Sequence, residues 1–385
     1  MSFSALEKIT ASLFKKTPPK NAVYRDLPSS LDHHRDAKER VGREAGIASP
    51  LQETLAKRFP AQAGLIQSMV ENLKQFASTG VTSQEGYLQF RYLYFQTAGV
   101  SNDQITGELA KIFPSPVVPE LVHSSLGQFS PTDVSSIVTD LKGNGVSRMK
   151  TKISADLLKA LRESLDREAG KDNGAGYRRE NEARTWYREP ALLACKEVVQ
   201  LAADPLFYHV ASQYLGVESI LSYITAWISR PHPNDAATLS QSAQLFHTDM
   251  SNPSFLKVFI YLNDVDERNG PHCLVPRTHK NKATELWRDG RIDDEEMATY
   301  HPRSTWDYQV GEAGSVFFVD TKAFHKGVPL IEGERHLAQF YYVDTLFGEH
   351  APLSPESPRF EPSRFGPSIL DYGPRFFSRY ALAAQ

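Results

Sequence analysis

The chain has little that would tie it to a membrane, an oxidising compartment or a nucleic acid. Only two cysteines occur among 385 residues, so no disulfide framework is expected and the cytoplasm is the expected location. No apolar run approaches the roughly 20 residues that span a bilayer, and residues 1–16 lack the apolar core of a secretory signal. The formal net charge of −3 gives no reason to expect a nucleic-acid partner.

Internal repeats and low-complexity tracts are also absent, which excludes solenoids and fibrous proteins. The 24 prolines and 23 glycines are spread along the chain, as is typical of a loop-rich β fold. Changes in composition and hydrophobic periodicity along the chain predict four parts. They are a polar leader (1–48), a helical N-terminal region (49–130), a β domain (131–350) and a C-terminal extension (351–385).

The helical region is predicted from an apolar stripe that repeats every 3.6 residues between positions 63 and 76. Thr82 with Glu85, and Ser101 with Gln104, have the spacing of capping boxes that open two further helices. The stripe must bury against the β domain or against a second subunit. A homo-oligomer formed through these helices is therefore one of the two expectations.

The β domain is predicted from four β-branched and aromatic segments, residues 221–229, 255–262, 315–319 and 337–343. Residues 132–150 are interpreted as a glycine turn around Gly143 and Gly145, followed by a short strand. Helices are expected from residue 154 and over residues 205–215. Short strands with such turns indicate a sandwich or jelly roll flanked by helices.

The strongest chemical signal is the pair His247 and Asp249. Residues two apart on extended backbone face the same side, so the imidazole and the carboxylate can point at one metal ion. A lone pair of this kind is common in surface turns. Two histidines and one carboxylate, with open positions left, form the facial triad of non-haem Fe(II) oxygenases.

His325 is the predicted third ligand, because a glycine turn and the buried strand 315–319 lead directly to it. Arg335 follows ten residues later, and a guanidinium is suited to the distal carboxylate of an oxo acid. His272 and His279 follow a turn that is expected to carry them away from the first two ligands. Gln244, three residues before His247, is a candidate hydrogen-bond partner of the co-substrate or of a ligand.

With these motifs in place, residues 132–345 resemble the phytanoyl-CoA dioxygenase-like family of Fe(II)/2-oxoglutarate-dependent oxygenases. The matching stretches are residues 140–161, 244–249, 257–280, 311–327 and 333–343. One departure is Gly327, at a position where some members place a serine or threonine that helps to bind the co-substrate. The first 130 residues have no counterpart in the minimal family domain.

The resemblance implies a double-stranded β-helix, a cupin-like jelly roll, with His247, Asp249 and His325 as iron ligands and Arg335 as the 2-oxoglutarate anchor. It also implies a dioxygenase that uses O2 and hydroxylates an unactivated C–H bond of a small molecule, releasing succinate and CO2. Two alternatives stay open at this point. One is a metal-dependent cupin-like enzyme without an oxo acid, and the other is a non-catalytic binding protein on the same barrel.

Overall fold

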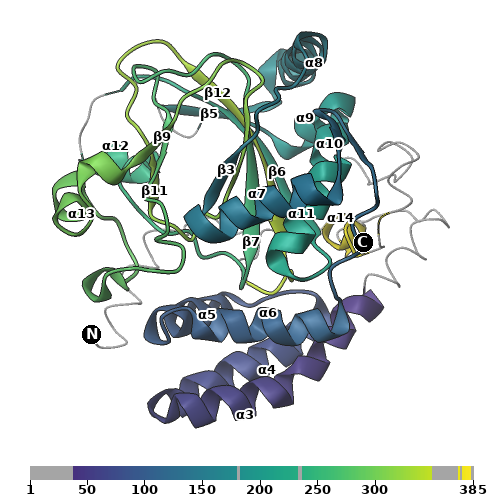
Figure 1. Ribbon diagram of the computed structural model, residues 1–385, viewed down its shortest axis with the longest axis vertical. Helices are drawn as coiled ribbons and strands as arrows, with labels where there is room; N and C mark the ends of the chain where they lie inside the picture. Colours follow the sequence, from purple (N-terminus) through teal and green to yellow (C-terminus); the bar gives the residue numbers. More distant parts are fainter. Residues whose placement is uncertain (1–37, 180–182, 233–235, 349–371, 373–374, 383–385) are drawn as a thin grey trace.

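The computed structural model describes residues 38–179, 183–232, 236–348, 372 and 375–382 (Figure 1). Most of the predicted leader and of the C-terminal extension lie outside these residues. Two antiparallel sheets form the centre. The large sheet has the strand order β3-β10-β7-β12-β6-β5-β4, and the small sheet has the order β11-β8-β9. The predicted jelly-roll core flanked by helices is therefore confirmed.

The large sheet contains all four strands predicted from sequence. They are β6 (Ile220–Ser229), β7 (Phe255–Tyr261), β10 (Val316–Val319) and β12 (Arg335–Val343). Shorter strands complete it: β3 (Val146–Arg148), β4 (Tyr177–Arg179) and β5 (Arg184–Tyr187). The small sheet consists of β8 (His272–Leu274), β9 (Asp307–Gln309) and β11 (His325–Gly327), and a separate hairpin pairs β1 (Val122–Ser124) with β2 (Gly127–Phe129).

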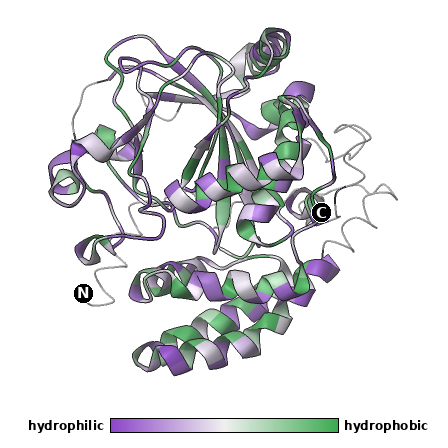
Figure 2. Cartoon of the chain, viewed as in Figure 1, coloured by the Kyte–Doolittle hydropathy of each residue, from purple (hydrophilic) through white to green (hydrophobic). Residues whose placement is uncertain are grey.

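Helices cover the outer face of the large sheet (Figure 1). They are α7 (Pro131–Asn144), α8 (Ala155–Gly174), α9 (Glu189–Ala194), α10 (Lys196–Ala202) and α11 (Pro205–Leu215). Phe207 of α11 packs against Phe318 and Phe340, with ring centroids 5.6 and 6.2 Å away. Figure 2 shows the hydrophobic residues gathered on the central strands and on parts of the surrounding helices. The buried apolar residues between the outer face of the large sheet and these helices form the main hydrophobic core.

The inner face of the large sheet turns toward the small sheet and encloses a second, more polar core. Register fixes which residues share it, because Phe317 is paired with Phe259, and Trp227 is paired with Leu337 of β12. The connections on this side include α12 (Ala236–Gln241), η3 (Thr284–Leu286), α13 (Asp294–Tyr300) and η4 (Arg303–Thr305).

A layer of helices lies below the sheets (Figure 1). It consists of η1 (Glu44–Ile47), α3 (Ala48–Arg58), η2 (Pro60–Gln62), α4 (Ala63–Thr79), α5 (Gln84–Gln96) and α6 (Val100–Ile112). The stripe on α4 buries inside this chain, where it packs with the neighbouring helices and with Phe347 from the end of the β domain. Phe347 lies 5.7 Å from Phe76 and 5.6 Å from Phe90, centroid to centroid.

Three local predictions were wrong. Residues 131–144 form α7 and not a turn, because Ser130 and Asp133 make a capping box and Gly145, at φ +82°, ends the helix. Ser83, not Thr82, caps α5. Gly99 precedes α6, so Ser101 lies inside that helix.

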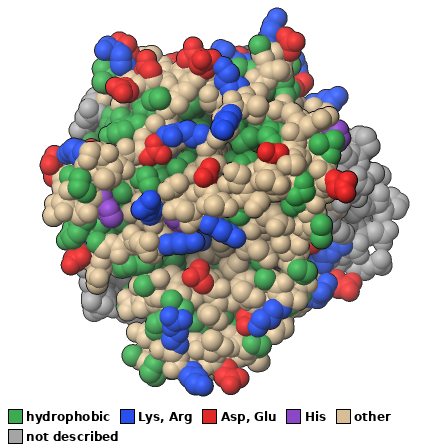
Figure 3. Space-filling model, in the orientation of Figure 1, with side chains coloured by type: hydrophobic (Ala, Val, Ile, Leu, Met, Phe, Trp, Pro, Cys, Tyr) green, Lys and Arg blue, Asp and Glu red, His purple; other side chains and the backbone are tan. Residues whose placement is uncertain are grey.

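The remaining described helix is α14 (Ser378–Leu382), near the C-terminus. On the face shown in Figure 3, basic and acidic side chains are interspersed. Within the described ranges, no helix combines the length and the apolar composition that a membrane crossing requires.

Candidate metal centre

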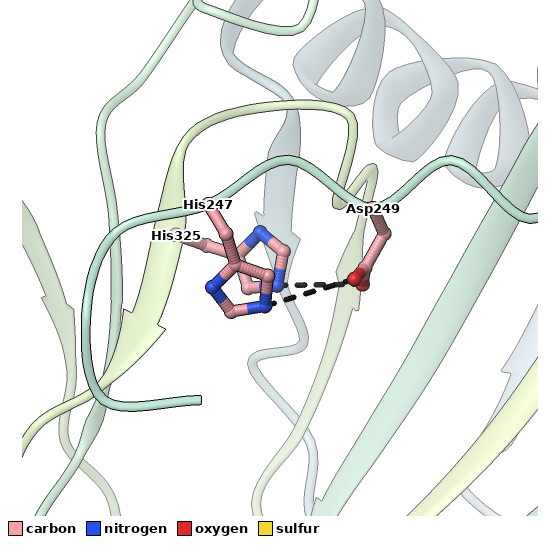
Figure 4. A group of neighbouring side chains, drawn as sticks. All are labelled: His247, Asp249 and His325. Atoms are coloured by element: carbon pink, nitrogen blue, oxygen red, sulfur yellow. Dashed lines mark ion pairs between the residues drawn. The ribbon is translucent and has the colours of Figure 1, made fainter. Parts of the chain in front are cut away.

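The structure brings His247, Asp249 and His325 together, although 78 positions separate the first and the last in the numbering (Figure 4). The backbones of His247 and His325 exchange two hydrogen bonds of 3.0 Å. The amide of Asp249 donates to the carbonyl of Thr321 at 2.9 Å. The segment around the His-x-Asp motif therefore runs antiparallel to the segment that carries His325, and this pairing fixes all three side chains.

The ligand atoms of these three side chains lie within 4.8 Å of one another. Nε2 of His247 is 3.6 Å from Oδ1 of Asp249, and Nε2 of His325 is 3.4 Å from Oδ2. Nδ1 of His247 lies 2.9 Å from the carbonyl of Leu245, and Nδ1 of His325 lies 3.0 Å from that of Ala323. Because a carbonyl only accepts, each Nδ1 carries the proton, which leaves the Nε2 lone pairs for a metal.

Electrostatics favour the protonation states that a metal requires. Burial and the neighbouring His325 hold the pKa of His247 well below its usual range. Burial opposes ionisation of Asp249, but Lys257, His325 and His247 outweigh it and hold the pKa of that carboxyl well below its usual range. A neutral imidazole and an ionised carboxylate are the forms that bind divalent cations.

Lys257 is part of this centre, which sequence reasoning missed. Its Nζ lies 2.6 Å from Oδ2 of Asp249, and both side chains are largely buried. From the sequence, Lys257 lies in a strand expected to line the barrel, where a wall or surface residue is commoner than a catalytic one. Its register partner Tyr341 on β12, at an inner position of the sheet, is the signal that places it toward the site.

Arg335 lies on the same inner face and is only 3% exposed. Its guanidinium donates to the carbonyl of Gly270 and, at 3.2 Å, to Oγ of Ser229. Its Nε has no hydrogen-bond partner, and among the described residues no carboxylate pairs with it. A Cβ at Gly327 would lie 3.1 Å from Nη2, so the glycine leaves room for the guanidinium. The inner face of the sheet therefore presents a buried positive charge without a carboxylate partner among the described residues.

The prediction for His272 was wrong. The turn after β7 does not carry it away, because β8 returns beside β11 in the small sheet. The His272 ring lies 5.3 Å from that of His325 and is 6% exposed. His279 was also expected to lie away from the first two ligands. Its ring faces Gly145 and the carbonyl of Lys142 instead of the triad.

Gln244 is buried, but the contact of its side chain goes to His232, whose Nε2 lies 2.7 Å from Oε1. Two further inner positions are Thr225, which sequence reasoning missed, and Trp227, which lies in a strand expected to line the barrel. The Oγ1 of the first and the Nε1 of the second are buried without a hydrogen-bond partner. Their register partners on β12 are Gln339 and Leu337, so alternation along β6 is the signal that identifies them as wall residues.

Comparison with known proteins gives a family match over residues 142–330, to the family described as phytanoyl-CoA dioxygenase. No curated protein matches the chain. Similar solved structures include the epimerase SnoN in complex with Fe3+, alpha ketoglutarate and nogalamycin RO, at 16% identity and TM-score 0.44 over 61% of this chain and 98% of that one.

Two further structures have comparable scores. HygX from Streptomyces hygroscopicus, with nickel and 2-oxoglutarate bound, is 16% identical with a TM-score of 0.40, over 57% of this chain and 90% of that one. EctD from S. alaskensis, with bound Fe, is 18% identical with a TM-score of 0.41, over 63% and 92%. The matched residues 142–330 span the predicted ligand positions. Residues 142–330, just under half of the chain, therefore form a domain of the phytanoyl-CoA dioxygenase-like family of Fe(II)/2-oxoglutarate-dependent oxygenases.

Proposed function

We propose that this protein is a non-haem Fe(II)/2-oxoglutarate-dependent dioxygenase that hydroxylates an unactivated C–H bond of a small molecule. The observation that carries the proposal is Arg335. A buried guanidinium without a carboxylate partner is costly, and an anionic ligand offsets that cost. Lys257 of the same inner face bonds Asp249, which completes a set of two imidazoles and one carboxylate with His247 and His325. We also propose residues 131–350 as the oxygenase domain.

The donor set fits ferrous iron. Two neutral histidines and one carboxylate are the ligands of the facial triad, which leaves positions for other ligands. In this assignment His247, Asp249 and His325 hold the metal, and the carbonyls at Leu245 and Ala323 orient the two rings. Bound iron supplies the activation of O2, coupled to the oxidation of 2-oxoglutarate to succinate and CO2.

The residues around the metal bind and orient the co-substrate. Arg335 takes the distal carboxylate of 2-oxoglutarate, because its planar fork matches a carboxylate and the absent side chain at Gly327 leaves that side of the guanidinium open. Gln244 remains a proposed co-substrate contact, with weaker support because its Oε1 is engaged by His232. Aromatic wall residues such as Trp227 and Phe259 exclude water from the reacting centre.

The experiment that tests this proposal measures 2-oxoglutarate binding to the anaerobic Mn(II)-loaded protein by calorimetry, for the wild type, Arg335→Lys and Arg335→Met. We expect a lower 2-oxoglutarate affinity in Arg335→Lys and a much lower one in Arg335→Met, with nearly unchanged Mn(II) affinity, because lysine keeps the charge but loses the fork. An unchanged oxo-acid affinity in both variants would remove Arg335 from the site.

Two further measurements separate the alternatives. Succinate formation from 2-oxoglutarate in the presence of Fe(II) and O2, without a primary substrate, distinguishes the oxygenase from a non-catalytic barrel and from a metal enzyme that needs no oxo acid. Incorporation of one atom of 18O from 18O2 into a substrate found by screening distinguishes hydroxylation from other oxidative outcomes. A product that contains no 18O would contradict the hydroxylase assignment.

A further inference from the structure

His272 stands where two elements of the site meet. It is the first residue of β8, and its register partner on β11 is Gly327, the residue that lies against the Arg335 guanidinium. Residues two apart in a strand share a face, so His325 and Gly327 both point to the side of His272. The imidazole therefore lies along the wall that joins the metal centre to Arg335.

The imidazole of His272 packs against three aromatic rings, but its Nε2 atom has no hydrogen-bond partner. Its centroid lies 5.1 Å from that of Phe259, 6.0 Å from that of Phe317 and 5.3 Å from that of His325. The backbone amide donates to Oη of Tyr261 at 3.1 Å, whereas Nε2 is buried with no hydrogen-bond partner. A buried polar nitrogen without a partner costs about 1–3 kcal/mol.

A role as a simple wall residue does not explain this cost. Phenylalanine or leucine would fill the same space beside Phe259 without burying an unpaired nitrogen. A role as a fourth metal ligand is not supported either. Among the described residues, the group whose ligand atoms lie within 4.8 Å of one another consists of His247, Asp249 and His325.

We infer that His272 donates a hydrogen bond from Nε2 to the carboxylate that Arg335 binds, the distal carboxylate of 2-oxoglutarate. The inference rests on the proposed function. Its support is that two unsatisfied donors, Nε2 of His272 and Nε of Arg335, belong to residues that both adjoin Gly327, which has no side chain. A carboxylate has about four acceptor sites, so it can take both donors.

The test compares two oxo acids on the anaerobic Mn(II)-loaded protein by calorimetry. One is 2-oxoglutarate, and the other is 2-oxopentanoate, which has a methyl group in place of the distal carboxylate. His272→Phe and His272→Leu remove the donor and keep an apolar wall. We expect them to weaken 2-oxoglutarate binding roughly 10- to 100-fold, the range for a hydrogen bond to a charged group. Binding of 2-oxopentanoate and of Mn(II) should stay within about twofold of the wild type.

His272→Gln keeps an N–H donor at similar reach and should recover most of the 2-oxoglutarate affinity. This rescue also keeps the test decisive if both apolar variants fail to fold, since a folded glutamine variant that loses both oxo acids equally overturns the inference. His279→Gln is the matched control. His279 is another 6% exposed histidine with an unpartnered buried nitrogen, but it lies against Gly145, and its replacement should leave both affinities unchanged.

Two other results would overturn the inference. Equal losses for the two oxo acids would place His272 at the metal end of the co-substrate, and no loss for either would leave it as a wall residue. Failure of the proposed function is distinguishable from these, because the wild-type protein would then bind Mn(II) and show no affinity for 2-oxoglutarate.

Discussion

The two faces of the large sheet differ in what their side chains leave unsatisfied. The outer face buries apolar residues from alternate positions of β6, β7, β10 and β12 against α7 and α11. The inner face, one residue out of step on the same strands, buries aromatic residues together with Lys257 and Arg335. Thr225, Trp227 and Arg335 each leave a buried polar atom unpaired on this inner face.

Because neighbouring residues of one strand point to opposite faces, the residues that stabilise the fold alternate with those that face the candidate site. Outer residues lower the free energy of the fold by burying apolar area. The unpaired donors and charges on the inner face raise it, because they cost free energy until a ligand satisfies them. We therefore expect changes on the two faces to affect different measurements.

The largest expected effect is the loss of metal from His325→Ala. Removal of a direct ligand should lower Mn(II) affinity by more than about 100-fold, since even residues that only orient a ligand cost about 10–100-fold. Stability of the metal-free protein should barely change. His301→Ala is the control, because His301 ends α13 and its ring lies beside Phe324. Metal titration checks both variants. If His301→Ala loses the metal and His325→Ala keeps it, the ligand assignment fails.

Phe340→Ala tests the opposite face. Phe340 is fully buried against Phe207, so we expect a loss of about 3–5 kcal/mol in the free energy of unfolding. Mn(II) affinity of the protein that remains folded should be unchanged. Urea unfolding in the presence of a chelator gives the first quantity, and metal titration without urea gives the second. A large change in metal affinity with little change in stability would contradict the separation of the two faces.

Arg335→Met should have the opposite effect to Phe340→Ala: it should weaken ligand binding and leave the unfolding free energy nearly unchanged. The variant loses hydrogen bonds to Gly270 and Ser229, but it also removes an unpaired buried charge, and these effects offset each other. We expect the metal-free variant to lie within about 1 kcal/mol of the wild type in unfolding free energy. Mn(II) with 2-oxoglutarate should raise the thermal midpoint of the wild type and much less that of the variant. Equal stabilisation of both proteins would show that the ligand does not use Arg335.

The sequence predicts the strands and the pair His247 and Asp249 because both follow from local rules. β-Branched and aromatic composition identified β6, β7, β10 and β12, and the i, i+2 spacing placed His247 and Asp249 on one side. The third ligand, His325, depended on the strand that leads to it and on the family resemblance. His272 was misplaced because its position depends on which strand β8 pairs with, and that long-range choice leaves no local trace. Lys257 was undervalued for the same reason, since its partner Asp249 precedes its strand in an irregular segment.

The predictions of helix boundaries were wrong for a different physical reason. Several Ser, Thr and Gly residues near each start compete as caps, and packing selects among them. Gly143 and Gly145 suggest a turn, but the capping box at Ser130 and the apolar positions of α7 outweigh them. Gly145 then serves as the helix end.

The smallest expected effect concerns the loop that follows Asp249 and the helices below it. Asn102 of α6 donates from Nδ2 to the carbonyl of Pro253 at 3.0 Å, and Tyr87 of α5 donates from Oη to the carbonyl of Met250 at 3.1 Å. Met250 follows the metal-ligand candidate Asp249 directly in the chain, so these two bonds connect the loop after Asp249 to helices α5 and α6. The two bonds come from the helical N-terminal region, and they argue for a measurable contribution of this region to the metal site.

Asn102→Ala should therefore lower Mn(II) affinity by a few-fold and less than about tenfold, because one neutral hydrogen bond contributes about 1 kcal/mol and only part of that loss reaches the loop. Asn72→Ala is the matched control. Asn72 bonds within the helical layer, to Gln89 and to the carbonyl of Ser68, so its loss should lower the stability of that layer and leave Mn(II) affinity unchanged. Competition titration against a metal-sensitive dye resolves a threefold difference. Equal effects of the two substitutions on metal affinity would mean that α5 and α6 act only through overall stability, and that the loop after Asp249 holds its position without them.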